Sequence, residues 1–178
     1  HLAGAHTRMS TVIDTAYATT ASAARLAERL RGARSLLVTT HDKPDGDAIG
    51  SALALARAAR SLGVDARVWL SGPFDPSLGA LLSGEAVGRA PESLPSGEFD
   101  LVAVVDTGSW SQLEHLGAWL RARHDRCIGV DHHRSGDTAF VDRIVDARCA
   151  SCTQALVPVL EAMGVRFDAP GSGGEGSI

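Results

Sequence analysis

The sequence predicts an α/β domain of three layers, in which a mostly parallel sheet carries helices on both faces. Short apolar runs alternate along the chain with longer segments of helical periodicity. These runs are continuously apolar, which is typical of strands buried on both faces of a parallel sheet. Hydrophobic residues make up 44% of the chain but aromatic residues only 4%, so we expect a core built from aliphatic side chains.

The first elements follow from periodicity and end signals. Residues 20–30 are predicted to be helical, because apolar residues recur there at positions i, i+3, i+4 and i+7. The apolar run within residues 35–40 predicts a buried strand. Residues 49–62 are rich in Ala and Leu and are followed by Gly63, the pattern of a helix that ends at a glycine.

The second half of the chain continues the alternation. Glycine and proline punctuate residues 74–95, so a loop with at most a short helix is expected there. The run Leu-Val-Ala-Val-Val at residues 101–105 is the strongest strand signal. The remaining elements are predicted as strands at 66–70, 127–130 and 141–145, and helices at 111–123 and 151–163. Pro158 is expected to bend or divide the last helix.

The length of 178 residues argues for one domain. We place this domain at residues 20–165. Residues 1–19 are interpreted as a leader and N-terminal segment, with Met9 as the expected natural start, since His1 is not a start residue. Residues 166–178 form a Gly/Ser-rich tail typical of a linker.

Composition excludes several classes of protein. The formal net charge of −4 offers no basic field, so no long nucleic acid is expected as a partner. Three cysteines, an odd number, argue against a disulfide framework and for a reducing compartment. The chain shows neither a long apolar run nor the apolar core of a signal peptide. We therefore expect a cytoplasmic protein with no membrane partner.

Acidic and imidazole side chains gather directly after three predicted strands. Because the carboxyl ends of parallel strands meet at one edge of a sheet, these side chains are expected to converge there. The residues are His41, Asp45 and Asp47 after the first strand, Asp106 after the strongest strand, and Asp131, His132 and His133 after the next.

Each segment alone has a simpler structural interpretation. Asp47 suits the N-cap of the following helix, Asp106 suits a helix cap, and adjacent histidines are often surface residues. Convergence of all three favours a site. A mixed His and Asp donor set suits borderline divalent metals such as Mn²⁺ better than Mg²⁺. One carboxylate placed between two such groups bridges a metal pair about 3.5–4 Å apart, the spacing used in phosphoryl hydrolysis.

Three ordered motifs resemble those of the DHH phosphoesterase family. They are His-x-x-Pro-Asp-Gly-Asp-Ala-Ile-Gly-Ser at residues 41–51, Val-Asp-Thr-Gly at 105–108, and Gly-Val-Asp-His-His at 129–133. The resemblance covers residues 20–165, and the first motif is most similar to the branch of nano-RNases and pAp phosphatases, which also includes cyclic-dinucleotide phosphodiesterases. It implies the family's N-terminal domain and a hydrolase of short oligoribonucleotides or small nucleotides such as pAp and linear or cyclic dinucleotides.

The resemblance also implies roles for single residues. His41 and Asp45 would hold one of two divalent metal ions, most suitably Mn²⁺, and Asp106 would bridge the pair. Asp47 and His132 would hold the second ion, and a water activated by both metals would attack the phosphorus.

Three further residues complete the implied site. His133 would face the substrate phosphate, and Asp131 would orient a histidine from behind the ligands. Arg134 is a weaker candidate for contact with the phosphate. Asp106, Asp131 and His133 are thus the residues expected to take part in catalysis, and the resemblance leaves a homodimer open.

The chain departs from the family pattern after residue 165. A fourth motif, which supplies another aspartate to the second metal, and a glycine-rich substrate-binding domain are not found in the sequence. We therefore expect weak binding of the second metal and little turnover. Two alternatives stay open: a fragment of a RecJ-type single-strand exonuclease, and a non-catalytic nucleotide- or metal-binding module.

Other features receive structural interpretations. Arg57 and Arg60 are predicted as solvated helix positions. Cys149 and Cys152 are predicted as small buried thiols at a helix start, and Ser109 as a helix cap.

Overall fold

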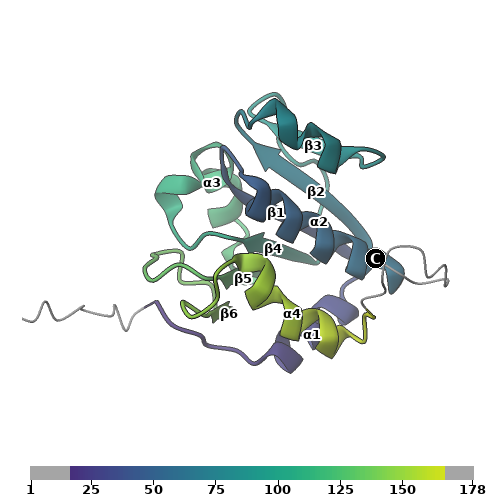
Figure 1. The fold of residues 1–178 in the computed structure, drawn as a ribbon, viewed down its shortest axis with the longest axis vertical. Helices are drawn as coiled ribbons and strands as arrows, with labels where there is room; N and C mark the ends of the chain where they lie inside the picture. Colours follow the sequence, from purple (N-terminus) through teal and green to yellow (C-terminus); the bar gives the residue numbers. More distant parts are fainter. Residues whose placement is uncertain (1–16, 167–178) are drawn as a thin grey trace, which may run out of the picture.

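A computed structural model describes residues 17–166, so most of the predicted leader and tail lies outside the described residues. Within this range strands and helices are interspersed along the chain, with β3 followed directly by β4 and β5 by β6 (Figure 1). The strands are β1 (Ser35–Asp42), β2 (Asp65–Ser71), β3 (Val87–Ala90), β4 (Leu101–Val105), β5 (Cys127–Asp131) and β6 (Asp142–Val145). The α-helices are α1 (Ala23–Gly32), α2 (Gly46–Ser61), α3 (Glu114–Arg121) and α4 (Cys152–Met163).

The six strands form one sheet in the order β3-β2-β1-β4-β5-β6, and every pair is parallel. The chain leaves β1 toward β2 on one side and later returns to β4 on the other, so the strand order reverses between β1 and β4. In open α/β sheets, ligands bind at the carboxyl ends of the strands beside such a reversal. The topology therefore directs attention to the ends of β1 and β4.

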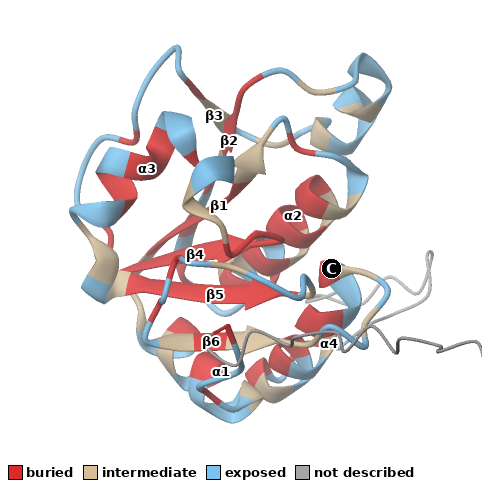
Figure 2. Ribbon diagram, turned by 90° about the vertical axis from the view of Figure 1, so that its left-hand side faces the viewer, coloured by how far each residue is buried: buried red, intermediate tan, exposed pale blue. Residues whose placement is uncertain are grey.

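Two apolar clusters cover the two faces of the sheet. Helices α1, α2 and α4 pack on one face around an aliphatic cluster that includes Leu26, Ile49 and Leu156. Helix α3 packs on the other face with Leu116, Leu120 and the aromatic residues of the second cluster. β4 and β5 are buried along their whole length between these layers (Figure 2). The predicted three-layer α/β fold with helices on both faces is thus confirmed.

One strand, β3, was not predicted from the sequence. β3 lies inside the segment predicted as a loop, although the short helix allowed there is present as a 3₁₀ turn at Pro76–Leu82. Of the four residues of β3 only Ala90 is buried, so no apolar run announces the strand. Its Gly88 lies against the ring of Trp69, where a Cβ atom would come within 2.1 Å of the indole. Packing on β2 therefore defines this edge strand.

The helix boundaries also differ from the predictions. α2 begins at Gly46, three residues before the predicted start, because Asp45 is its N-cap and accepts a hydrogen bond from Ala48 N. The predicted helix at 111–123 is a short 3₁₀ turn followed by α3. Ser109 precedes that turn without a capping bond from its side chain. α4 runs unbroken through Pro158, which therefore does not divide it.

Residues 17–19, which sequence analysis left in the N-terminal segment, pack against the sheet. Thr19 Oγ1 donates to the Val145 carbonyl at 2.8 Å and accepts from Val145 N at 2.9 Å. The segment thus runs beside the outer strand β6. None of the helices in residues 17–166 combines the length and apolar character needed to cross a membrane.

Candidate metal centre

The ends of β1, β4 and β5 lie side by side in the sheet and surround a polar cleft of about 440 Å³. Residues from these ends, from the start of α2 and from the approach to α4 line the cleft: His41, Asp45, Asp47, Asp106, Gln112, His132, His133, Ala150 and Ser151. All the predicted metal ligands therefore lie in one place. Gln112 and Ser151 are lining residues that sequence analysis did not single out.

Asp106 lies between two imidazoles at the centre of the cleft. Its Oδ2 is 3.6 Å from His41 Nε2 and its Oδ1 is 3.3 Å from His132 Nε2. The side chain is buried, and Oδ1 has no hydrogen-bond partner among the described residues. A buried carboxylate oxygen without a donor is costly unless a cation or another group compensates it. Asp106 therefore lies between the two imidazoles with one oxygen toward each.

The backbone turns sharply to present Asp106. Its φ is +62°, in the left-handed region that few residues other than glycine occupy. The Asp106 N–H donates to the Val130 carbonyl at 3.0 Å, which ties the turn to β5. Strained backbone of this kind often occurs at functional sites.

Both imidazoles have their second nitrogen against a backbone carbonyl. His41 Nδ1 lies 2.9 Å from Asp42 O, and His132 Nδ1 lies 3.3 Å from Cys149 O. A carbonyl only accepts, so a neutral ring in either position donates from Nδ1 and turns Nε2 toward Asp106. This is the tautomer in which a neutral histidine binds a metal through Nε2.

The electrostatics agree with a cation site. The neighbouring Asp106 carboxylate raises the pKa of His41 despite the opposing effect of burial. A proton and a cation therefore compete for this imidazole. Two groups of ligand atoms come within 4.8 Å of one another, His41 with Asp45 and Asp106, and Asp106 with His132 and His133. Asp106 belongs to both groups.

Asp47 is held from outside its own helix. It does not cap α2, as its position in sequence suggests, because Asp45 takes that role. Its carboxylate instead accepts hydrogen bonds from Cys152 N (2.7 Å), Thr153 N (3.0 Å) and Thr153 Oγ1 (2.6 Å) at the start of α4. Burial raises the pKa of Asp47, but these hydrogen bonds outweigh burial and lower it. Its Oδ2 still lies 3.7 Å from His132 Nε2.

The start of α4 and the segment just before it therefore orient two predicted ligands of the second metal. Cys149 O fixes the ring of His132, while Cys152 and Thr153 fix Asp47. Cys152 is buried as expected, but Cys149 is only partly buried. Residues 149–153 lie outside the three family motifs, so only contact across the fold shows this role.

The remaining predicted residues lie behind and beside the cleft. Asp131 is buried and its Oδ1 lies 2.7 Å from His133 Nδ1, the arrangement expected of a carboxylate that orients a histidine. His133 lines the cleft, whereas Arg134 is exposed and is not among the lining residues. Tyr17, which sequence analysis did not consider, donates to Asp131 Oδ2 at 2.7 Å.

Comparisons with known proteins agree with this geometry. Residues 35–169 match the model of the DHH family, N-terminal domain. The chain is 33% identical over 135 residues to the bifunctional oligoribonuclease and PAP phosphatase NrnA of Thermus thermophilus, a match that covers 75% of this chain and 39% of that protein. The chain thus spans about two fifths of the length of this relative.

A solved structure shares the fold. An exopolyphosphatase-related protein from Bacteroides fragilis superposes with a TM-score of 0.72 at 19% identity, over 80% of this chain and 43% of that one. The manganese-bound exonuclease RecJ gives a TM-score of 0.47 at 20% identity, over 79% of this chain and 36% of that one.

Proposed function

This chain belongs to the DHH family, and we propose that it is the catalytic domain of a metal-dependent phosphoesterase acting on short oligoribonucleotides or small nucleotides. The substrates we propose are pAp and linear or cyclic dinucleotides. The observation that carries the proposal is Asp106, whose two oxygens face the Nε2 atoms of His41 and His132, and whose buried Oδ1 has no hydrogen-bond partner among residues 17–166.

The residues of the cleft fit a pair of divalent cations. His41 and Asp45 would hold one ion, His132 and Asp47 the other, and Asp106 both. When bound, two such ions supply water activation and neutralise negative charge on the phosphoryl oxygens. We propose Mn²⁺ because imidazole nitrogens and carboxylate oxygens occur together in the donor set.

The protein's own side chains position the ligands and contact the substrate. The buried Asp106 keeps the two ligand sets in a fixed relation, and Asp131 orients His133 at the wall of the cleft. His133 is the side chain we propose for contact with the substrate phosphate. Gln112 also lines the cleft. Its Oε1 accepts a hydrogen bond from Thr107 Oγ1 at 2.7 Å, which leaves its amide N–H groups as donors.

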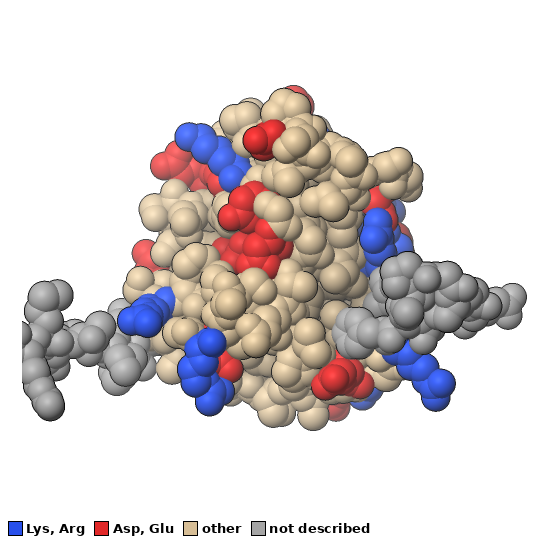
Figure 3. Space-filling model, in the orientation of Figure 1, with Lys and Arg blue, Asp and Glu red and all other residues tan. Residues whose placement is uncertain are grey.

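Charge supports a small substrate. Acidic side chains gather near the middle of one face, and Lys and Arg side chains lie toward its periphery (Figure 3). The net charge of the chain is −4. Long nucleic acid binds through many phosphate contacts with basic side chains, whereas a short nucleotide needs only the local charge of the bound cations. The relative's name, an oligoribonuclease and PAP phosphatase, supports the same substrate class.

Hydrolysis of a dinucleotide tests the proposal. The chain is incubated with Mn²⁺ and pApA, with pAp and a cyclic dinucleotide in parallel, and products are separated by chromatography. We expect mononucleotide release that stops on chelation of the metal. Binding of the nucleotide without product, measured by calorimetry, contradicts the proposal and favours a nucleotide-binding module.

A further inference from the structure

A tyrosine from the start of the described chain reaches the back of the cleft. Tyr17 precedes α1 and is separated from Asp131 by 114 positions, yet its hydroxyl donates to Asp131 Oδ2 at 2.7 Å. Its side chain is 6% exposed. Nothing in the three sequence motifs points to it.

Asp131 is fully engaged at both oxygens. Oδ1 accepts from His132 N at 2.8 Å and from His133 Nδ1 at 2.7 Å, while Oδ2 accepts from Tyr17. Asp131 is 1% exposed, so water does not compete freely for these positions. The Tyr17 hydroxyl therefore fixes the rotation of the carboxylate, and the carboxylate in turn fixes the ring of His133.

Two glycines form the slot for the Tyr17 ring. A Cβ atom at Gly108 would lie 1.8 Å from Tyr17 Oη, and one at Gly136 would lie 2.6 Å from Tyr17 Cε2. The Gly108 carbonyl also accepts from Asp137 N and Thr138 N, at 2.7 and 2.9 Å. The loops after β4 and β5 thus close around the ring, which gives a steric reason for the glycine in the second motif.

The phenol stays a donor at neutral pH. Burial is the largest cause, and the neighbouring Asp131 carboxylate adds to it; together they raise the pKa of Tyr17 well above its ordinary value of 10.0. Because the phenol is protonated and the carboxylate can only accept, Tyr17 is the donor and Asp131 the acceptor in this hydrogen bond. Asp131 Oδ1 then receives the Nδ1 proton of His133.

We propose that Tyr17 is a positioning residue of the hydrolysis reaction, acting through Asp131 to hold the ring of His133 with Nδ1–H turned inward and its Nε2 edge turned toward the cleft. The inference rests on the proposed function for its kinetic consequence, but the hydrogen-bond chain itself is tested without turnover. It adds a residue from the N-terminal segment to a site otherwise built from strand ends.

The test compares Tyr17→Phe with Thr19→Val. Phe keeps the ring in the glycine slot and removes only the hydroxyl. Thr19→Val removes two hydrogen bonds that attach the same segment to Val145, without touching Asp131. The tautomer of His133 is followed by imidazole ¹⁵N resonances in the metal-free full chain at pH about 8.5, above the ordinary pKa of histidine. Values of kcat and KM are then measured with Mn²⁺ and pApA.

We expect wild type and Thr19→Val to show the Nδ1–H tautomer of His133, and Tyr17→Phe to shift toward Nε2–H. We expect kcat to fall about ten-fold in Tyr17→Phe with KM changed less than about two-fold, because the lost alignment acts on the reacting phosphate. An unchanged tautomer in Tyr17→Phe, or an equal loss in Thr19→Val, overturns the inference. If wild type shows no turnover, the proposed function fails, and the tautomers alone decide the role of Tyr17.

Discussion

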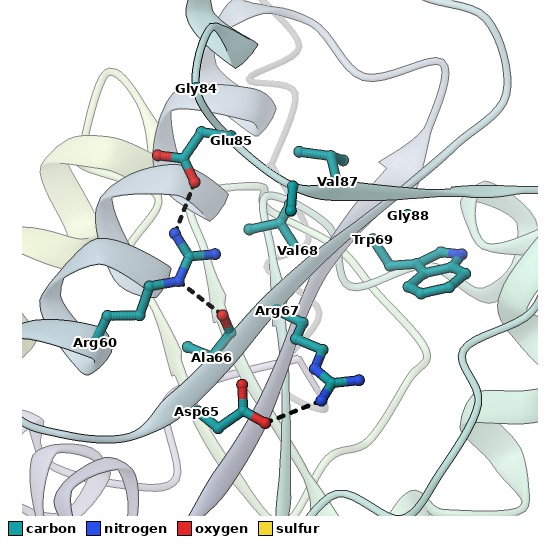
Figure 4. Close-up of a pocket in the computed structure, with 11 residues that line it drawn as sticks. Arg60, Asp65, Ala66, Arg67, Val68, Trp69, Gly84, Glu85, Val87 and Gly88 are labelled. Atoms are coloured by element: carbon teal, nitrogen blue, oxygen red, sulfur yellow. Dashed lines mark hydrogen bonds and ion pairs between the residues drawn. The ribbon is translucent and has the colours of Figure 1, made fainter.

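The cleft at the ends of β1, β4 and β5 and a groove beside the edge strand β3 are two hollows of opposite character. The groove is the larger, about 650 Å³ against 440 Å³. Its charged side chains are paired: Glu85 lies 2.6 Å from Arg60, and Arg67 lies 3.1 Å from Asp65 (Figure 4). Glu85 also lies 2.7 Å from Arg57, outside the groove. Arg60 also donates to the Ala66 carbonyl at 2.8 Å.

In the cleft, by contrast, the acidic side chains have no basic Lys or Arg partners among the described residues. Carboxylates and imidazoles converge there without a Lys or Arg among the lining residues, and one buried oxygen of Asp106 has no donor among residues 17–166. Size therefore does not locate the functional site in this molecule. The candidate site is located instead by ionisable side chains without Lys or Arg partners. Paired charges stabilise the fold, whereas converging carboxylates and imidazoles without such partners are stabilised by a bound cation or ligand.

The groove also corrects a prediction. Arg57 and Arg60 are not simply solvated positions of α2, because both reach Glu85, whose side chain is only 10% exposed. They attach the turn before β3 to α2, which is why the short edge strand is held in place.

Removal of the shared carboxylate gives the largest expected effect. We expect Asp106→Asn to weaken Mn²⁺ binding more than about 100-fold in calorimetry, since a lost shared ligand costs more than a lost outer partner. Asp65→Asn in the groove is the matched control and leaves the titration unchanged. Thermal unfolding confirms that both variants fold. Retained binding in Asp106→Asn contradicts its position between two ions.

A smaller effect is expected from Thr153, which holds Asp47 from α4. We expect Thr153→Val to weaken binding of the second Mn²⁺ about ten-fold, because the 2.6 Å bond to Asp47 is lost while two backbone donors remain. Thr153→Ser keeps the hydroxyl and is expected to bind like wild type. Equal affinities of the Val and Ser variants argue against the role of this hydroxyl.

The smallest expected effect lies in the groove. We expect Glu85→Gln to lower the free energy of unfolding by about 1 kcal/mol, because its arginine partners are partly exposed and solvent screens the pairs. Urea denaturation measures the change, and Mn²⁺ binding stays at the wild-type value. A loss of metal affinity in this variant removes the distinction between the two hollows.

The stability that Glu85 and its arginine partners contribute depends on pH. Burial raises the pKa of Glu85, but the contacts with Arg60 and Arg57 outweigh burial and lower this pKa below its ordinary value of 4.5. Stability contributed by the ionised Glu85 is therefore present above pH 4.5 and is lost as the pH falls toward the lowered pKa. We expect the difference between wild type and Glu85→Gln to shrink over that interval, followed by urea denaturation at each pH.

Sequence alone predicted most of the fold and the composition of the cleft. The apolar runs at β1, β4 and β5 indicate strands buried on both faces, and the polar residues that follow them reach a common edge in any parallel arrangement. β3 could not be found in this way, because its burial depends on Trp69 and on the Glu85 pairs rather than on its own residues.

The sequence by itself determined which candidate residues follow which strand ends, because periodicity and order along the chain are local properties. Only the tertiary structure decided how those residues are held. Asp47 depends on amides 105 and 106 positions away, His132 on the carbonyl of Cys149, and Asp131 on Tyr17. Hydrogen bonds between distant segments form where the packed layers bring donors and acceptors together, and no spacing in the sequence encodes that meeting.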